Sequence, residues 1–193
     1  AIHDIYGGKD VKREQEAADH KSKRVADSTA AGLIWPTMKY EVAENCMTCH
    51  GLAHPGLKAD DLAKMLGAGH PINPGFELVK YSQGSVRHRH YPPDIKTNAE
   101  MTPQELAQIY LVGQAAALVS ATEVISKSSE AKYKEAQSKR VEIAKSALGG
   151  VSEAAGLLAA PTRENAIKFV QSIAGKDLTS AVGSKLPAKS DYK

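Results

Sequence analysis

The sequence predicts a mainly α-helical protein, in which a region of short helices and long loops precedes a bundle-like helical half. Three observations support this class. Hydrophobic residues recur with a helical period in several segments, and helix-capping sequences precede some of them. The alternation of hydrophobic and polar residues that indicates strands is virtually absent. The segment 72–100 contains several prolines and glycines and no helical period, which predicts a long loop.

The helices expected in the first half are short, apart from the first of them. A strongly charged helix is predicted from 10 to about 31, and it ends before Pro36, because proline restricts the preceding residue to extended geometry. Two shorter helices follow at about 41–50 and 59–67. In the second of these Met65 falls on the hydrophobic stripe, so we expect it in the core.

The second half begins with two long helices. Thr102 and Glu105 form a capping box, with Pro103 at the first helical position. A single hydrophobic stripe is expected along the helix that follows, formed by Leu106, Ile109, Tyr110, Gly113, Ala117 and Val124. A second amphipathic helix is predicted over 128–148, closed by two glycines.

Shorter helices are expected after Ser152 and Thr162, each of which we predict to be a helix cap. Residues 176–193 are expected to form a tail with little core. We therefore divide the chain into a loop-rich region, 1–100, and a helical region, 101–193, that packs on it. One single domain is the alternative.

The candidate functional site is the sequence Cys46-Met47-Thr48-Cys49-His50. C-x-x-C-H is the attachment sequence of a c-type haem, because two thiols at this spacing can add to the two vinyl groups of one porphyrin. The alternatives are a redox dithiol, which should open a helix inside a βαβ unit, and a zinc site, which needs further ligands. We expect one covalent haem c, attached through Cys46 and Cys49, with His50 as the proximal ligand. The region 1–100 would thus be the haem-binding region.

The charge and the hydropathy of the sequence limit the kinds of partner that we expect. The 25 Lys and Arg residues against 22 Asp and Glu give a formal net charge of +3, with both signs mixed along the chain. A nucleic-acid-binding protein concentrates its basic residues on one face, so no nucleic-acid partner is expected. No run of about 18 apolar residues occurs, so no membrane span is expected either.

The first residues of the chain bear on the cellular compartment that we expect for the protein. Its first residue is Ala1 rather than methionine, and neither a charged n-region nor an apolar h-region follows. We interpret this as a mature chain whose signal peptide has been removed. Since covalent haem attachment also belongs outside the bacterial cytoplasm, we expect a periplasmic or otherwise exported protein.

The side chain on the distal face of the haem decides between electron transfer and ligand binding. His70 follows a helix stop and precedes a proline, a rigid arrangement suited to delivering one imidazole. We therefore rank His70 first as the distal ligand, His88 second and His90 third.

Three further side chains are candidates for contact with the haem. Trp35, the only tryptophan, lies close to the motif in sequence and packs either on the porphyrin or in the protein core. Arg87 and Arg89 alternate with His88 and His90, so in an extended segment the arginines would point one way and the histidines the other. The arginines could then pair with the haem propionates, the alternative being a solvated basic patch.

Residues 67–71 (GAGHP), 76–78 (FEL) and His88 resemble a pattern in large multihaem c-type cytochromes. They are similar to the G-H-P…F-E-L…H-W run in the relatives of the tetrahaem cytochrome of ammonia oxidisers, over roughly residues 44–120. The resemblance implies that these histidines serve haems, usually as distal ligands. The chain departs from the family in having one haem motif, and in having Arg89 where tryptophan is usual. With one haem, the two histidines cannot both be distal ligands unless one of them serves the haem of another chain.

These observations predict a periplasmic monohaem c-type cytochrome that transfers electrons, with its iron held by two histidines. It would be an electron carrier rather than an enzyme, with redox proteins as partners. One alternative is a five-coordinate haem protein that binds or converts nitric oxide, oxygen or a nitrogen oxyanion. Another is a haem subunit of a larger redox complex, and the C-terminal helices could also form a homodimer by bundle packing.

Overall fold

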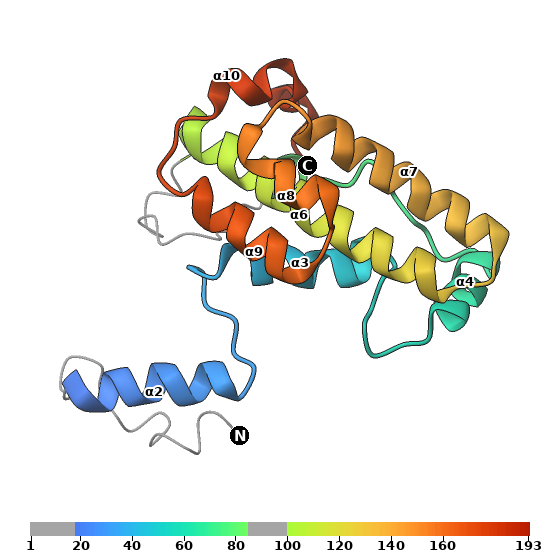
Figure 1. Cartoon of the computed structure of the whole chain (residues 1–193), viewed down its shortest axis with the longest axis horizontal. Helices are drawn as coiled ribbons and strands as arrows, with labels where there is room; N and C mark the ends of the chain where they lie inside the picture. The colour runs from blue at the N-terminus through green and yellow to red at the C-terminus, as the bar shows by residue number, and fades with distance from the viewer. Residues whose placement is uncertain (1–17, 85–99) are drawn as a thin grey trace.

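The structure is a computed structural model that describes residues 18–84 and 100–193. Across these two ranges the chain is all-helical and contains no β-strand, which confirms the predicted fold class. Figure 1 shows two long helices side by side at the centre, with shorter helices packed around them.

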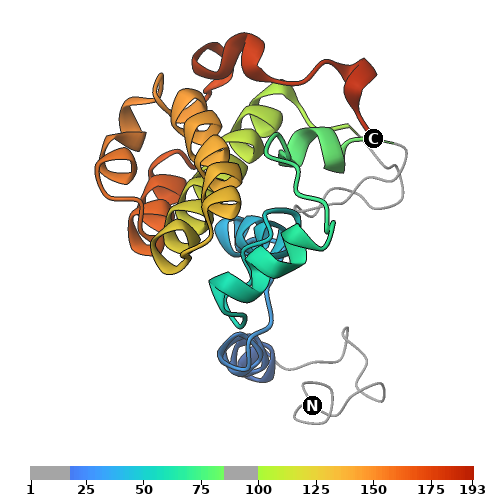
Figure 2. The same ribbon diagram turned by 90° about the vertical axis from the view of Figure 1, so that its right-hand side faces the viewer.

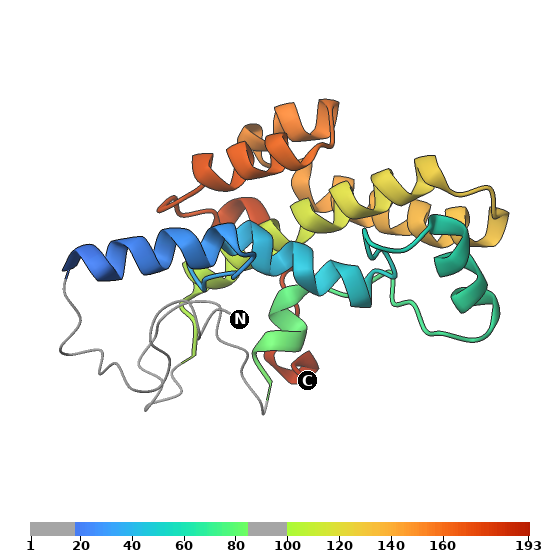
Figure 3. The same ribbon diagram turned by 90° about the horizontal axis from the view of Figure 1, so that it is seen from below.

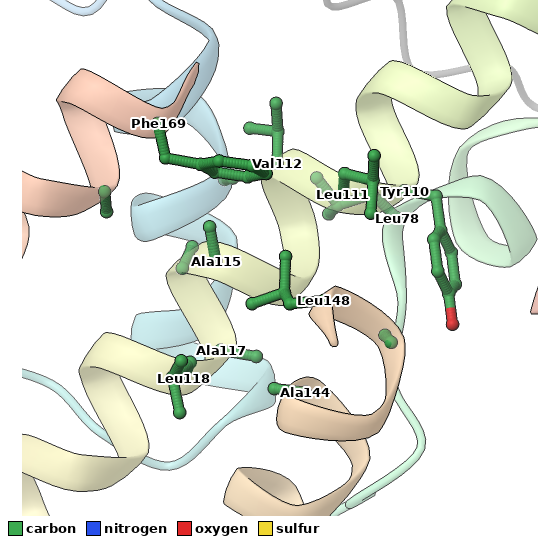
Figure 4. Packing of buried hydrophobic residues seen from close by; sticks show 14 of the residues in the cluster. Leu78, Tyr110, Leu111, Val112, Ala115, Ala117, Leu118, Ala144, Leu148 and Phe169 are labelled. Atoms are coloured by element: carbon green, nitrogen blue, oxygen red, sulfur yellow. The ribbon is translucent and has the colours of Figure 1, made fainter. Parts of the chain in front are cut away.

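Helix α6, Pro103–Lys127, is the centre of the structure (Figures 1 and 4). The predicted capping box is present: Thr102 Oγ1 accepts from the Glu105 amide, and the Glu105 carboxylate accepts from the Thr102 amide at 2.7 Å. The single hydrophobic stripe predicted for this helix is narrower than the surface that is actually buried, because every residue over 107–119 is buried. Several helices pack against α6, so it has no solvent face along this stretch; among them are α3 (Lys39–His50), α4 (Ala59–Gly67), α5 (Leu78–Ser82), α7 (Ala131–Leu148) and α9 (Arg163–Ser172).

Helix α6 is also the one helix in the described ranges that is long and apolar enough to cross a membrane, by length and composition alone. The mean hydropathy of its most apolar window is 1.4, and 72% of that window is buried inside the protein. A hydrophobic surface on every side of a helix is what a central core position requires.

Helix α7, Ala131–Leu148, returns alongside α6 after a short connection (Figure 1). It begins three residues later than expected, because Ser128 and Ser129 form the turn. The Asp60 carboxylate accepts hydrogen bonds from Ser128 Oγ and from the Ser129 amide, both at 3.0 Å. This contact joins the start of α4 to the connection between the two long helices.

The helices expected at 41–50 and 59–67 form as α3, Lys39–His50, and α4, Ala59–Gly67. The expectation that Met65 is buried is wrong, since 37% of it is exposed. Leu62 and Leu66 make the core contacts of α4 instead.

The charged helix near the N-terminus is described from residue 18 onward, as α2, Ala18–Ala30. In Figures 1 and 2 it lies beyond the main group of helices, and in Figure 3, where the structure is seen from below, it overlaps the start of α3 in projection only. The part predicted before residue 18 lies outside the described residues.

The expectation of a structureless segment from 72 onward is wrong at 78–82, where the short helix α5, Leu78–Ser82, forms. The carboxylate of Glu77 caps this helix by accepting from the amides of Val79, at 2.8 Å, and Lys80. A hydrophobic period cannot indicate a helix of little more than one turn, and glutamate is not among the residues preferred at an N-cap, so the sequence carried no clear signal for α5.

The chain after α7 continues as short helices (Figure 1). They are η3 (Ser152–Ala154), α8 (Ala155–Ala159), α9 (Arg163–Ser172), α10 (Thr179–Val182), η4 (Gly183–Lys185) and η5 (Lys189–Asp191).

The predicted cap at Thr162 is confirmed, since its hydroxyl accepts from the Asn165 amide at 3.2 Å. The cap predicted at Ser152 is wrong, because this residue lies inside η3 and its hydroxyl donates to the Glu153 carboxylate. The last segment is more than a tail, because Leu178 and Val182 are buried against α6.

One hydrophobic cluster joins the two halves of the chain (Figure 4). It includes Met47 from α3, Leu78 from α5, Leu118 from α6, Leu148 from α7 and Phe169 from α9. Residues on both sides of position 100 therefore contribute to one core, and the helical region packs on the region that carries the haem motif.

Candidate functional site

The last two turns of α3 bring Cys46, Cys49 and His50 to one pocket of about 260 Å³. Cys46 is half-buried, Cys49 is exposed, and both are free thiols. Residues three apart on a helix lie on one face, which places both thiols toward the same space. The other described residues that line the pocket are Asn45, Phe76, Leu78, Tyr81 and Ser82.

Aromatic rings line the same pocket as the thiols. The His50 imidazole stacks on Phe76, with ring centroids 4.0 Å apart and planes within 5° of parallel. Tyr81 lies 4.8 Å from the Phe76 centroid and 6.3 Å from that of His50. Because Phe76 is buried, the stacked imidazole is held against a fixed hydrophobic surface at the edge of the pocket.

Helix α3 ends directly after His50 in a Schellman motif. The Leu52 amide donates to the Cys49 carbonyl and the Ala53 amide donates to the Thr48 carbonyl, both at 3.0 Å. This ending places Leu52 in the left-handed region, at φ +48°, which a non-glycine residue adopts at a cost. Burial of the Leu52 side chain in a second small core with Leu62 offsets that cost.

Three buried side chains of α7 bind the carbonyls that follow His50, and we name Tyr133, Gln137 and Arg140 the α7 clamp. Tyr133 Oη donates to the Leu52 carbonyl at 2.6 Å. Gln137 Nε2 and Arg140 Nη1 donate to the Gly51 carbonyl at 2.9 Å and 3.0 Å. The end of a helix leaves such carbonyls without intrahelical partners, so the clamp satisfies groups that would otherwise be buried and unpaired.

Arg140 is the most unusual member of the α7 clamp, since it is a cation that is only 3% exposed. Its guanidinium also donates to Gln137 Oε1 at 2.6 Å, Ser120 Oγ at 3.1 Å and Met47 Sδ at 3.4 Å. Burial lowers the pKa of Arg140 to about 10. Because this value is still well above neutral pH, the side chain is charged there. The charge lies at the carboxyl end of α3, where the helix dipole favours a cation.

The sequence analysis missed the α7 clamp, although a signal for it was present. Positions 133, 137, 140, 144 and 148 recur at helical spacing and are Tyr, Gln, Arg, Ala and Leu. A glutamine and an arginine on the same stripe as three core residues indicate buried polar groups with specific partners.

Two other predicted site residues lie in the described part of the chain, His70 and Trp35, and neither lines the pocket. His70 is exposed, its Nδ1 lies 2.9 Å from the Pro71 carbonyl oxygen, and it is not among the described lining residues. Trp35 lies in the turn between α2 and α3, where its Nε1 donates to Thr29 Oγ1 at 2.8 Å. The remaining candidates lie outside the described residues: Arg87, His88, Arg89 and His90.

The location of the thiols bears on the redox-dithiol alternative. Burial raises the pKa of the Cys46 thiol, and the neighbouring Cys49 raises it further. Reactive dithiols lie at helix amino ends, where the dipole lowers a thiol pKa, whereas Cys46 and Cys49 lie near the carboxyl end of α3. Within the described residues, neither a helix amino end nor a lowered pKa of Cys46 therefore activates a thiolate.

For the zinc alternative, the described residues include no group of three or more His, Cys, Asp or Glu side chains placed to hold a metal ion.

No family model, curated protein or solved structure matches this chain. The resemblance to the multihaem cytochromes therefore rests on the sequence motifs. The fold and the site together define an all-helical protein that presents C-x-x-C-H at the end of a helix, beside a pocket with aromatic and aliphatic walls.

Glu77 makes stability depend on pH, because it is a buried carboxylate at the start of α5. Burial raises the pKa of Glu77 above its ordinary value of 4.5, and the amide hydrogen bonds of Lys80 and Val79 oppose this in part. The folded state then binds the proton more tightly than the unfolded state does. The stabilising effect of Glu77 protonation is thus fully present below pH 4.5 and is lost as the pH rises through the raised value.

We predict that Glu77→Gln removes this dependence. The free energy of unfolding of the wild type and of Glu77→Gln is measured with urea at several pH values between about 4 and 7. As the pH rises, the stability of the wild type should fall relative to that of Glu77→Gln. Glu135→Gln is the control, since Lys139 lowers the pKa of that exposed carboxyl and its contribution should run the other way. A wild-type curve parallel to that of Glu77→Gln would contradict the prediction.

Proposed function

We propose that this protein is a monohaem c-type cytochrome that transfers electrons in the periplasm or another exported compartment. Cys46 and Cys49 would hold the haem through thioether bonds, and His50 would be the proximal ligand. Bound in this way, the haem supplies a one-electron iron couple. The observation that carries the proposal is that both thiols and the imidazole line one pocket at the end of α3.

The residues at the pocket fit a covalent haem. The thiols are free and share one helix face, as addition to two vinyl groups of one porphyrin requires. Phe76, Leu78 and Tyr81 provide apolar surface for the macrocycle. Phe76 fixes the plane of the His50 ring by stacking, and the α7 clamp fixes the backbone that follows it. These contacts would orient the imidazole, although His50 itself is exposed to solvent.

One observation favours a five-coordinate haem protein as the second candidate. Among the described residues that line the pocket, His50 is the one imidazole, and no methionine occurs. A distal ligand would have to come from outside this set, as the ranking of His70, His88 and His90 requires. Without it the iron would be open to nitric oxide, oxygen or a nitrogen oxyanion.

The first experiment is the absorption spectrum of the purified protein, ferric and ferrous, with and without carbon monoxide. The protein should be produced in a host that attaches haem c, and its mass should show one covalent haem. Low-spin bands that ignore carbon monoxide would support two protein ligands and electron transfer. High-spin bands and rapid binding of carbon monoxide would favour the five-coordinate alternative, and a protein without covalent haem would refute both.

We predict that His70→Ala converts the iron to a high-spin form that binds carbon monoxide. The reason is that loss of the distal imidazole leaves one coordination position open. His88→Ala is the matched variant and should leave the spectrum low-spin. The reverse pattern would transfer the distal role to His88.

A further inference from the structure

We infer that Arg140 is a positioning residue for the haem-binding turn and that its buried positive charge raises the reduction potential of the iron. This inference rests on the proposed function, since it concerns the potential of a haem held by His50. The two parts of it depend on different properties of Arg140, its hydrogen bonds and its charge.

The hydrogen bonds connect Arg140 to the ligand through one residue. Gly51 directly follows His50, and its carbonyl accepts from both Arg140 and Gln137. The close approach depends on the absence of a side chain, since a Cβ at Gly51 would lie 2.3 Å from Arg140 Nη2. Arg140 also contacts Met47 Sδ on the preceding turn, so it binds both the last turn of α3 and the residue after it.

The charge of Arg140 is shielded from water and is not neutralised by an ion pair in the described part of the chain. The printed acceptors of its guanidinium are a carbonyl, an amide, a hydroxyl and a thioether, all of them neutral. A buried charge is screened much less than a surface charge, so it acts over a longer distance. A positive charge near the iron favours the ferrous state, which carries one positive charge fewer, and therefore raises the potential.

Acidic residues on the same side of α3 and α6 oppose this effect only weakly. Glu123 is exposed to solvent and pairs with Lys127. Both carboxylate oxygens of Glu44 lie 3.1 Å from Arg163 Nε. Solvent and pairing thus screen the carboxylates, while the charge of Arg140 lies in the protein interior.

Three variants separate charge from hydrogen bonding. Arg140→Met removes the charge and its hydrogen bonds. Gln137→Met removes the hydrogen bond of Gln137 to the same Gly51 carbonyl and the one that Gln137 accepts from Arg140, but it keeps the positive charge. Lys139→Met removes one positive charge from the neighbouring, exposed position on α7. The midpoint potential of each haem-loaded protein is measured by spectroelectrochemical titration.

We expect Arg140→Met to lower the midpoint potential by about 59 mV, which is a tenfold change in a one-electron equilibrium. Gln137→Met and Lys139→Met should each change it by less than about 18 mV, a twofold change. Equal potentials in Arg140→Met and the wild type would overturn the inference. An equal fall in Arg140→Met and Gln137→Met would overturn its charge part, since loosening of the turn would then explain the whole change.

A second pair of variants keeps Arg140 in place, in case Arg140→Met does not fold. Ser120 Oγ accepts from Arg140 Nη2 and borders a cavity of about 60 Å³ that leaves room for a larger side chain. Ser120→Asp would neutralise the guanidinium by pairing with it, while Ser120→Asn has the same shape without the charge. Ser120→Asp should lower the potential and Ser120→Asn should not, and equal potentials in the two would overturn the inference.

Failure of the proposed function gives a different result. A wild-type protein without covalent haem would refute the proposed function, and the inference with it. A wild-type protein that carries haem, with one potential shared by all the variants, would refute the inference alone.

Discussion

A Cys46→Ser, Cys49→Ser double variant is expected to carry no covalent haem. Thioether bonds to a haem could form only at these two thiols, which are the only cysteines in the chain. The double variant should have the mass of the polypeptide alone and lose the haem spectrum when denatured in acid and extracted with organic solvent. Each single variant retains one thiol, so it should hold haem through one thioether bond and in lower yield.

Asn45→Ser is the matched control for the loss of haem. Asn45 lies beside Cys46 and lines the same pocket, but it carries no thiol. This variant should retain covalent haem in wild-type yield. If the double cysteine variant still carried covalent haem, the assignment of the motif would be wrong.

The second large effect is expected from Gly51→Ala, which should destabilise the protein by about 3 kcal/mol. The backbone of Gly51 has φ −91° and ψ −4°, which alanine adopts without strain. The added Cβ, however, would lie 2.3 Å from Nη2 and 2.5 Å from Cζ of Arg140, and 2.5 Å from the Met47 carbonyl oxygen. The guanidinium must then move away from the Gly51 carbonyl, which leaves a buried charge with fewer partners. The midpoint of unfolding in urea measures the loss.

Gly67→Ala is the control for Gly51→Ala, since a Cβ at Gly67 meets nothing within 4 Å. Gly67→Ala should leave stability unchanged or raise it by up to about 1 kcal/mol. The double variant Gly51→Ala, Arg140→Met should be less unstable than the sum of its two single changes, because the methionine removes the guanidinium that the Cβ meets. Additive effects would show that the clash with Arg140 is not the cause.

Local signals in the sequence were sufficient for the fold class and for most helix boundaries. Three signals act within a few residues of the chain, so they can be recognised without knowledge of the tertiary structure: the capping box at Thr102, the cap at Thr162 and the glycines after α7. The same holds for the arrangement of Cys46, Cys49 and His50, because helical spacing alone places two thiols and an imidazole near one another.

Local signals failed where distant residues decide the structure. The sequence indicated one stripe on α6, but burial on all sides arises from helices packed around it. Met65 fitted the stripe of its helix and is exposed, because Leu62 and Leu66 reach the small core formed with Tyr133. Residues 176–193 looked too polar for a core, yet Leu178 and Val182 are enough to anchor them on α6.

The sequence by itself determined that the chain is helical and that two thiols and a histidine lie together at the end of one helix. Only the tertiary structure decided what surrounds them, namely Phe76 against the imidazole and the α7 clamp on the carbonyls that follow. The physical reason is the difference in range. Helix formation and capping depend on residues within one or two turns, whereas the clamp joins Gly51 to Arg140, 89 positions further along the chain, and forms only when α3 and α7 both pack on α6.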